Sequence, residues 1–150
     1  MDPRVWGSNA WIFLHSITMA YPDNPTIYDQ QNYNNFFTNL ADVLPCSVCV
    51  ENYKIHLKLY PITNALDSKK KLTRWLFDIH NKVNKEKGLP DFSYDDFKQK
   101  YSELYGEEEI QFGGDESIYD KYKYYILLII LFIIFSYRNE IYKFLFNRRY

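Results

Sequence analysis

Apolar residues recur at helical spacing in five successive segments, and prolines or glycines separate these segments. They cover about residues 6–21, 27–44, 46–59, 68–88 and 94–105. Residues three or four positions apart share one face of a helix, so each segment has a broad apolar face to bury. The sequence shows no sustained two-residue alternation and no Asn-Gly or Asp-Gly hairpin turn. It therefore predicts an all-α fold, a small bundle with aromatic side chains in its core.

A different composition follows this bundle. Residues 106–121 contain an acidic run and two adjacent glycines, which predicts a flexible acidic linker. Residues 124–137 carry no charge, with Lys121, Lys123 and Arg138 on either side. That stretch is short for a membrane span, but flanking lysines and tyrosines extend its reach, so a transmembrane helix is expected at 122–137 and a basic tail at 138–150. The alternative is a buried helix of a soluble core.

Charge and the N-terminal residues restrict partner and location. Eighteen Lys and Arg face 19 Asp and Glu, a net charge of −1, so the chain has no basic excess to hold nucleic acid. The first residues, Met-Asp-Pro-Arg, lack the features of a secretory signal or a transit peptide. The expected location is therefore a membrane, crossed once, with the N-terminal domain in the cytosol. The basic tail favours the opposite orientation.

Both cysteines of the chain lie in one motif, Pro45-Cys46-Ser47-Val48-Cys49. A C-x-x-C pair closes a small ring that opens and re-forms easily, which suits electron transfer. Pro45 is predicted to be the first residue of a helix, so that the cysteines lie in the first turn, where free N–H groups favour a thiolate. Zinc binding with histidine ligands and plain apolar packing remain alternatives.

Several polar and aromatic residues outside the motif share helix faces. Trp11 and His15 are four residues apart, as are His80 and Asn84, and Asn81 lies three residues before Asn84. Each set is predicted to form one wall of a slot, because such spacings place side chains together. Buried asparagines need hydrogen-bond partners, which a ligand could supply. The alternatives are core histidines and tryptophans, and asparagines on a solvated helix face.

These elements together resemble the Erv/ALR family of flavin-linked sulfhydryl oxidases. The resemblance rests on Trp11-Ile12-Phe13-Leu14-His15, the C-x-x-C motif and His80-Asn81-Lys82-Val83-Asn84, in this order. It covers about residues 6–100, and the chain looks like the short members with a hydrophobic segment that large DNA viruses encode; the membrane would then be a host or virion membrane. The resemblance implies that residues 1–105 form an oxidase domain, a four-helix bundle with a short fifth helix that holds FAD, usually in a homodimer.

The resemblance also implies roles for individual residues. Cys49 would lie next to the isoalloxazine ring and Cys46 would meet the substrate. The activity would oxidise protein dithiols and pass electrons through FAD to oxygen, giving hydrogen peroxide, with no metal. The implied cofactor contacts are Gly7, Trp11, His15, Tyr53, His56, Trp75, His80, Asn81, Lys82, Asn84 and Lys87.

The chain departs from its relatives in two places. Phe77 and Tyr94 stand where many relatives carry a structural disulfide, which predicts aromatic packing in its place. The further shuttle pair of many relatives is also absent, so substrate is expected to reach Cys46 directly, and a thioredoxin-like dithiol protein is the expected partner. The competing hypotheses are a membrane-tethered zinc module using Cys46, Cys49 and histidines, a flavin-free dithiol carrier, and a membrane-anchored scaffold.

Overall fold

The computed structural model describes residues 1–106, 112 and 118–137. The chain divides into two compact units, Met1–Gly114 and Asp115–Tyr150. All regular structure among the described residues is helical, which confirms the predicted all-α class.

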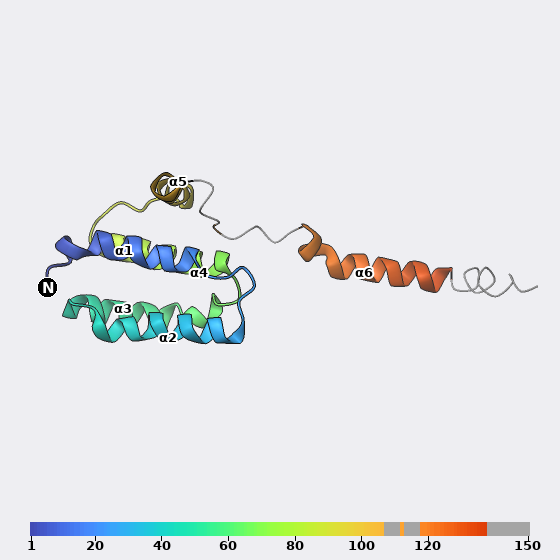
Figure 1. Ribbon diagram of the computed structural model, residues 1–150, viewed down its shortest axis with the longest axis horizontal. Coiled ribbons are helices and arrows are strands. Elements are labelled where there is room, and N and C mark those ends of the chain that lie inside the picture. Colours follow the sequence, from blue (N-terminus) through green and yellow to red (C-terminus); the bar gives the residue numbers. More distant parts are fainter. Residues whose placement is uncertain (107–111, 113–117, 138–150) are drawn as a thin grey trace, which may run out of the picture. The chain divides into compact units, whose positions relative to one another are not determined.

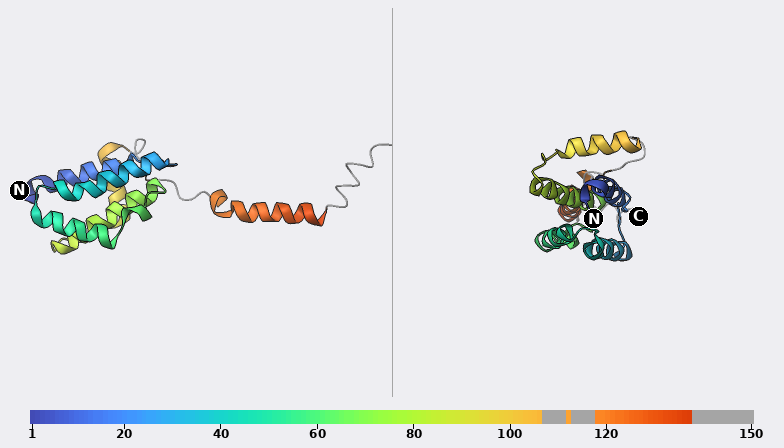
Figure 2. Two further views of the ribbon diagram at one scale, coloured as in Figure 1. Left: turned by 90° about the horizontal axis from the view of Figure 1, so that it is seen from below. Right: turned by 90° about the vertical axis from the view of Figure 1, so that its left-hand side faces the viewer.

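The first unit is a four-helix bundle with an additional helix across it. Helix α1 packs along α4 and α2 packs along α3, and the two pairs form two layers (Figure 1). The fifth helix, α5, runs across the outer side of the α1–α4 layer (Figure 2). The helices are α1 (Pro3–Met19), α2 (Ile27–Val43), α3 (Ser47–Leu59), the short 3₁₀ helix η1 (Ile62–Asn64), α4 (Lys69–Glu86) and α5 (Tyr94–Tyr105).

Side-chain caps set the helix starts. Thr26 and Ser93 form capping boxes with the residues three positions later, and Ser68 accepts a hydrogen bond from the Lys71 N–H. Helix α1 begins earlier than its apolar pattern indicates, because Asp2 caps it and Pro3 fits its first turn. Gly88 follows α4 with a φ of 67°, as expected for a glycine just past a helix end.

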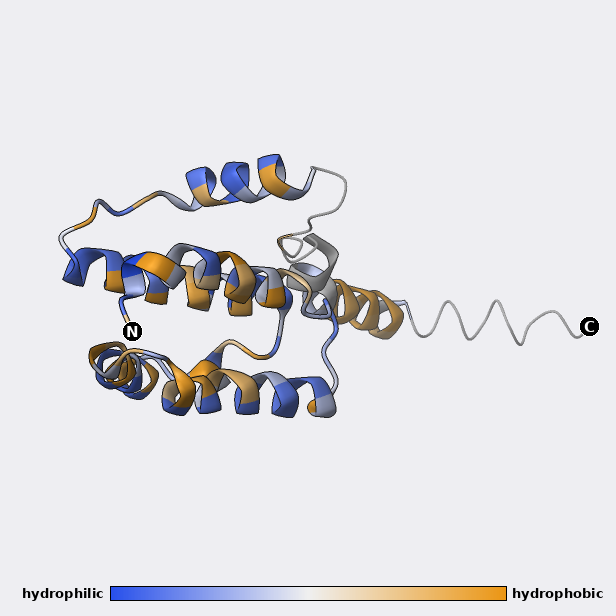
Figure 3. Cartoon of the chain, turned by 60° about the vertical axis from the view of Figure 1, so that its left-hand side comes forward, coloured by the Kyte–Doolittle hydropathy of each residue, from blue (hydrophilic) through white to orange (hydrophobic). Residues whose placement is uncertain are grey.

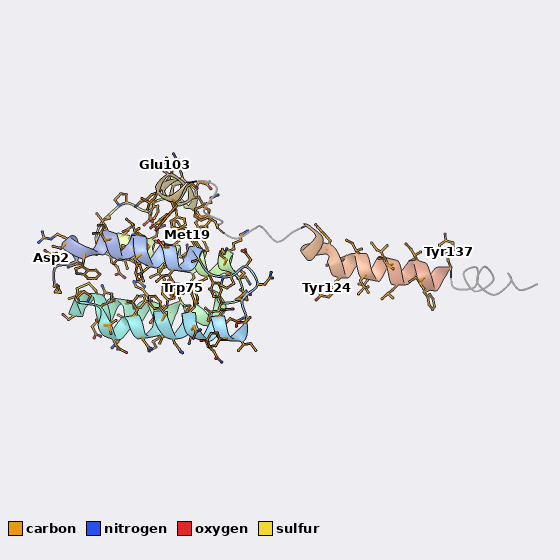
Figure 4. The ribbon with its side chains drawn as sticks, in the orientation of Figure 1. Asp2, Met19, Trp75, Glu103, Tyr124 and Tyr137 are labelled. Atoms are coloured by element: carbon orange, nitrogen blue, oxygen red, sulfur yellow. A yellow bond between two sulfur atoms is a disulfide. The ribbon has the colours of Figure 1, made fainter. Side chains whose placement is uncertain are left out.

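The main core lies between the two layers, where the apolar faces of the helices meet (Figure 3). Phe37 and Leu72 are fully buried there, and the Trp75 indole packs edge-on against Phe37. Figure 4 labels Trp75 between the two layers. The Tyr53 hydroxyl donates to the Phe37 carbonyl at 3.0 Å. These contacts hold α3 against α2 and α2 against α4, so the C-x-x-C motif at the start of α3 has a fixed support.

A second, aromatic core lies between α4 and α5. The rings of Phe77 and Tyr94 meet edge-to-face with centroids 5.0 Å apart, and Phe97 packs against both. The Arg74 guanidinium lies over the two rings, 5.1 Å from the Phe77 centroid and 4.8 Å from that of Tyr94. Aromatic packing at positions 77 and 94 is thereby confirmed, and it joins α5 to the bundle without a covalent bond.

The second unit contains helix α6 (Ile118–Ser136). Within the part of the chain that the structure describes, no helix is both long and apolar enough to cross a membrane, so the predicted span at 122–137 is not supported. Asp120, Lys121 and Lys123 occupy the start of α6 and leave an uncharged stretch of about 20 Å, against about 30 Å of hydrocarbon in a bilayer. Most of the predicted linker at 106–121 and all of the predicted tail at 138–150 lie outside the described residues.

Candidate active site

The C-x-x-C motif is a closed disulfide at the N-terminus of α3. Cys46 and Cys49 are bonded, with their Cα atoms 5.1 Å apart, and both are half-buried. Cys46 is the N-cap, in extended conformation, and its sulfur accepts a hydrogen bond from the Cys49 N–H at 3.3 Å. Pro45 therefore precedes the helix, and its predicted place as the first helical residue is wrong. The sulfur at position 46 takes the role that a hydroxyl or carboxylate oxygen has in most caps.

Helix α3 carries three of the predicted residues on one face. Cys49, Tyr53 and His56 follow one another at spacings of four and three, and the last two are buried. His56 Nε2 lies 3.1 Å from Glu86 Oε1 on α4 without forming a hydrogen bond, and neither ring nitrogen of His56 has a hydrogen-bond partner in the described part of the chain. This face directs Cys49 toward the bundle interior.

Trp11, His15 and His80 form one cluster between α1 and α4. The Trp11 and His80 rings stack with centroids 3.9 Å apart and planes 10° apart. His15 Nε2 and His80 Nδ1 share a hydrogen bond of 3.1 Å, while His15 Nδ1 is buried and has no partner among the described residues. The structure thus brings together side chains from two helices that the sequence grouped only by family resemblance.

Burial keeps both histidines neutral. Desolvation, and then the neighbouring His80, hold the pKa of His15 well below its usual value. Desolvation, followed by the charges of Lys100 and Lys87, lowers the pKa of His80 to about 4. Near pH 7 one ring therefore donates and the other accepts, and the pair offers polar atoms without net charge.

Helix α5 contributes residues that the sequence analysis did not include in the site. The rings of Phe97 and Tyr101 lie 4.8 Å and 5.4 Å from that of His15, and the charge of Lys100 acts on both histidines. Phe97 and Tyr101 are four residues apart and so share a helix face. That spacing was visible in the sequence, but only the packing of α5 shows that the face covers His15.

The C-terminal half of α4 borders a cavity of about 310 Å³. Among the predicted residues Trp75, Asn81 and Lys82 line it, together with Tyr60, whose carbonyl accepts a hydrogen bond of 2.9 Å from Trp75 Nε1. The Lys82 ammonium lies 5.5 Å from the Tyr60 ring centroid. The cavity is thus partly apolar, and its charged lining combines Lys82 and Lys85 with Asp78 and Asp91.

The remaining predicted residues differ in their surroundings. Both ends of the Asn81 amide bond the backbone of Phe92, at 3.0 Å and 3.4 Å, so this side chain already joins α4 to the segment before α5. Asn84 is half-buried and Lys87 is exposed at the end of α4. At Gly7 an added Cβ would meet no atom within 4 Å, so α1 leaves open space one turn before Trp11.

Comparison with known proteins agrees with this arrangement. A sequence model described as the Erv1/Alr family matches residues 8–102, which include the disulfide, the histidine pair and the cavity residues. The chain belongs to the Erv1/Alr family. The resemblance noted in the sequence is thereby confirmed.

Individual Erv1/Alr relatives come from viruses and fungi. "Probable FAD-linked sulfhydryl oxidase R368" of Acanthamoeba polyphaga mimivirus is 42% identical over 95 residues, 63% of this chain and 66% of the relative. "Mitochondrial FAD-linked sulfhydryl oxidase erv1" of Schizosaccharomyces pombe is 34% identical over 69% of this chain and 57% of the relative. The match thus spans less than two thirds of the length of either protein.

Solved structures of Erv1 share this fold. The crystal structure of the FAD binding domain of Erv1 from Saccharomyces cerevisiae aligns with a TM-score of 0.64 and 26% identity, over 69% of this chain and 96% of that domain. The yeast Erv1 core aligns with a TM-score of 0.63. The bundle with its crossing helix is therefore the Erv1 architecture.

The zinc alternative lacks a ligand set. Across residues 1–106, 112 and 118–137, no three His, Cys, Asp or Glu side chains gather to hold a metal ion. The two cysteines are joined to each other, which leaves no thiolate for a metal.

Proposed function

We propose that the chain is an FAD-dependent sulfhydryl oxidase, which forms disulfides in dithiol proteins and passes the electrons to oxygen with release of hydrogen peroxide. The observation that carries the proposal is the Cys46–Cys49 disulfide at the start of α3, inside a bundle that belongs to the Erv1/Alr family. Relatives named as FAD-linked sulfhydryl oxidases support this chemistry.

The residues present fit a flavin nucleotide. His15 Nδ1 and both ring nitrogens of His56 are buried without hydrogen-bond partners in the described chain, which suits a polar ligand. Trp11 and His80 supply flat surfaces for a ring system, and Lys82 and Lys87 supply positive charge for phosphates. Gly7, Tyr53, Trp75, Asn81 and Asn84 are proposed as further contacts. Bound there, the flavin would supply the two-electron chemistry that links a dithiol to oxygen.

The cysteine pair performs the thiol chemistry. A substrate thiolate attacks Cys46 Sγ, the Cys46–Cys49 bond breaks, and Cys49 leaves as a thiolate. The second substrate thiolate then attacks its partner sulfur and releases Cys46, so the substrate loses two electrons and the pair gains them. The Cys49 N–H that now reaches Cys46 Sγ would stabilise a Cys46 thiolate, and the N-terminus of α3 adds its dipole. Cys49, on the buried face of α3, is the sulfur assigned to the cofactor side.

Replacement of Cys49 tests this assignment. Cys49→Ser removes the sulfur that exchanges electrons with the cofactor, so oxygen consumption with a small dithiol should fall to the uncatalysed rate. The matched control is Ser47→Ala, inside the same ring, which should keep most of the activity. Purified wild-type chain should be yellow. Turnover that persists in Cys49→Ser, or colourless folded protein that cannot be reconstituted with FAD, would contradict the proposal.

A homodimer is also proposed, as the family resemblance implied. Its support is a set of exposed apolar side chains on α1 and α2, such as Phe13 at 61% and Ile27 at 74% exposure. Analytical ultracentrifugation of the full chain measures its oligomeric state directly. A monomer at the concentration used for activity measurements would contradict the proposed homodimer.

Membrane attachment, without a span, is the proposed location, with the oxidase unit on the cytosolic side. Residues 124–135 of α6 are apolar and exposed on every side, from 42% at Ile126 to 72% at Phe135, and Figure 3 colours this stretch of the helix hydrophobic. A helix that is apolar on every face needs an apolar environment on every side, which lipid supplies. The full chain should therefore float with lipid vesicles, and Ile130→Glu/Ile133→Glu should not. Equal flotation would contradict attachment through α6.

A further inference from the structure

Exposed apolar side chains lie on both sides of the disulfide. Val43 ends α2 three residues before Cys46 and is 72% exposed, and Val48 lies between the two cysteines and is 68% exposed. Pro45, directly before Cys46, is also exposed. We call Val43, Pro45 and Val48 the apolar collar. Surface valines are ordinary when scattered, but here they surround the one bond that must be touched by another molecule.

Two pairs of opposite charges lie near the collar. Lys54 Nζ lies 2.9 Å from Asp42 Oδ1, and Arg4 lies 2.7 Å from Asp2 in the N-terminal segment. That segment is beside the motif, since the Met1 amine donates to the Pro45 carbonyl at 2.6 Å. Figure 1 shows the junction of α2 and α3 at this same end of the bundle. An apolar centre with a polar rim is the anatomy of a protein-binding surface.

The covalent chemistry identifies the occupant. Attack on Cys46 requires a thiolate within bonding distance of its sulfur, so the residues next to the substrate cysteine must pass over the collar. The 150 residues contain no cysteine outside this motif, so no second pair within them takes the electrons first. The Met1 ammonium and the exposed Glu51 add one charge of each sign to the two ion pairs, so the surface offers no net charge to attract a charged segment.

From this juxtaposition we infer that the collar is the substrate-docking surface and that it selects a dithiol protein segment whose reactive cysteine is flanked by apolar side chains. The inference rests on the proposed oxidase function and adds the substrate class. The collar acts before electron transfer: it holds the apolar neighbours while the substrate thiolate displaces Cys49 from Cys46. The collar contributes to substrate binding. Its loss should therefore raise the KM for protein thiols and leave the KM for a small dithiol unchanged.

Two synthetic dithiol peptides test the collar with the full chain. Both contain Cys-Gly-Gly-Cys, flanked by leucines in one and by glutamates in the other. The wild type should oxidise the leucine peptide with a kcat/KM about tenfold higher, the effect expected when a valine-sized apolar contact is buried. Val43→Asp should remove that preference, while dithiothreitol oxidation stays within about twofold of the wild type. Val43 is chosen because Val48 lies inside the disulfide ring.

The matched control is Leu59→Asp. Leu59 is 62% exposed at the opposite end of α3, so the same charge is added away from the disulfide. Its peptide preference should equal that of the wild type. Three results would each contradict the proposal that the collar docks the substrate. They are a wild type that shows no preference for the leucine peptide, a Val43→Asp variant that keeps this preference, and a Val43→Asp variant that loses dithiothreitol oxidation. A wild type that oxidises no dithiol at all would instead overturn the proposed function, so the two failures are distinguishable.

Discussion

At the scale of single residues, the neutral histidine pair is the most constrained part of the candidate site. His15 is fully buried and His80 stacks on Trp11, so a proton on either ring would add an unsolvated charge. Lys100 and Lys87 oppose the same proton at His80. Neutrality of the pair is therefore a requirement of the folded state.

This requirement makes stability depend on pH in a defined window. The pKa of His80 is lowered to about 4 in the folded chain, whereas an unfolded histidine titrates near 6.5. Between these values the unfolded state binds more protons, so the free energy of unfolding should fall as pH drops from about 6.5 to about 4. Urea unfolding at several pH values measures the slope.

The control for this prediction is His80→Asn. It removes one titrating ring, so the free energy of unfolding should depend less steeply on pH between 6.5 and 4, by at most about 1.4 kcal/mol per pH unit. The contribution of His15 to this slope should remain. An unchanged slope in the variant would show that His80 is not responsible. Surface carboxylates near Arg4 or Lys98 titrate below this window, because those partners lower the pKa of Asp2 and Asp95.

At the scale of elements, α5 depends on aromatic contacts for its position. Phe77 on α4 is 3% exposed and meets Phe92, Tyr94 and Phe97 edge-on. Arg74 covers the outer side of this group. Because α5 in turn covers His15, the aromatic cluster supports the site as well as the fold.

Truncation of Phe77 should therefore be costly. Phe77→Ala should lower the free energy of unfolding by about 3–5 kcal/mol, the usual range for a buried phenylalanine, and Phe77→Leu by less. Tyr28→Ala is the matched control, since Tyr28 is 72% exposed, and should change it by at most about 0.5 kcal/mol. Thermal or urea unfolding gives both values. A small effect at Phe77 would mean that α5 is held by other contacts.

At the scale of the whole molecule, the bundle leaves polar groups unpaired that a ligand could satisfy. His15 Nδ1 and the ring nitrogens of His56 have no hydrogen-bond partner among the described residues, although all are buried. A ligand that binds only the folded state stabilises it in proportion to the logarithm of its concentration. Under the proposed function that ligand is FAD.

Removal of the cofactor should therefore lower the melting temperature. Chain stripped of flavin should regain stability as FAD is added, by about 2.7 kcal/mol when free FAD is 100 times its Kd. Riboflavin, which lacks the phosphates and adenosine, is the control ligand and should stabilise less if Lys82 and Lys87 bind the phosphates. Equal melting temperatures with and without FAD would contradict a cofactor site in the bundle.

The sequence by itself determined most of the helices and the cysteine pair suited to redox chemistry, because helical periodicity, caps and the C-x-x-C motif are local patterns. Ser68, Ser93 and Gly88 mark helix ends as their residue types require, and the order of motifs identified the family. Tertiary structure decided what depends on packing between distant segments: that Asn81 bonds Phe92, that Phe97 and Tyr101 cover His15, and that Cys46 caps α3. Local sequence cannot specify such contacts, because they depend on which helix faces meet.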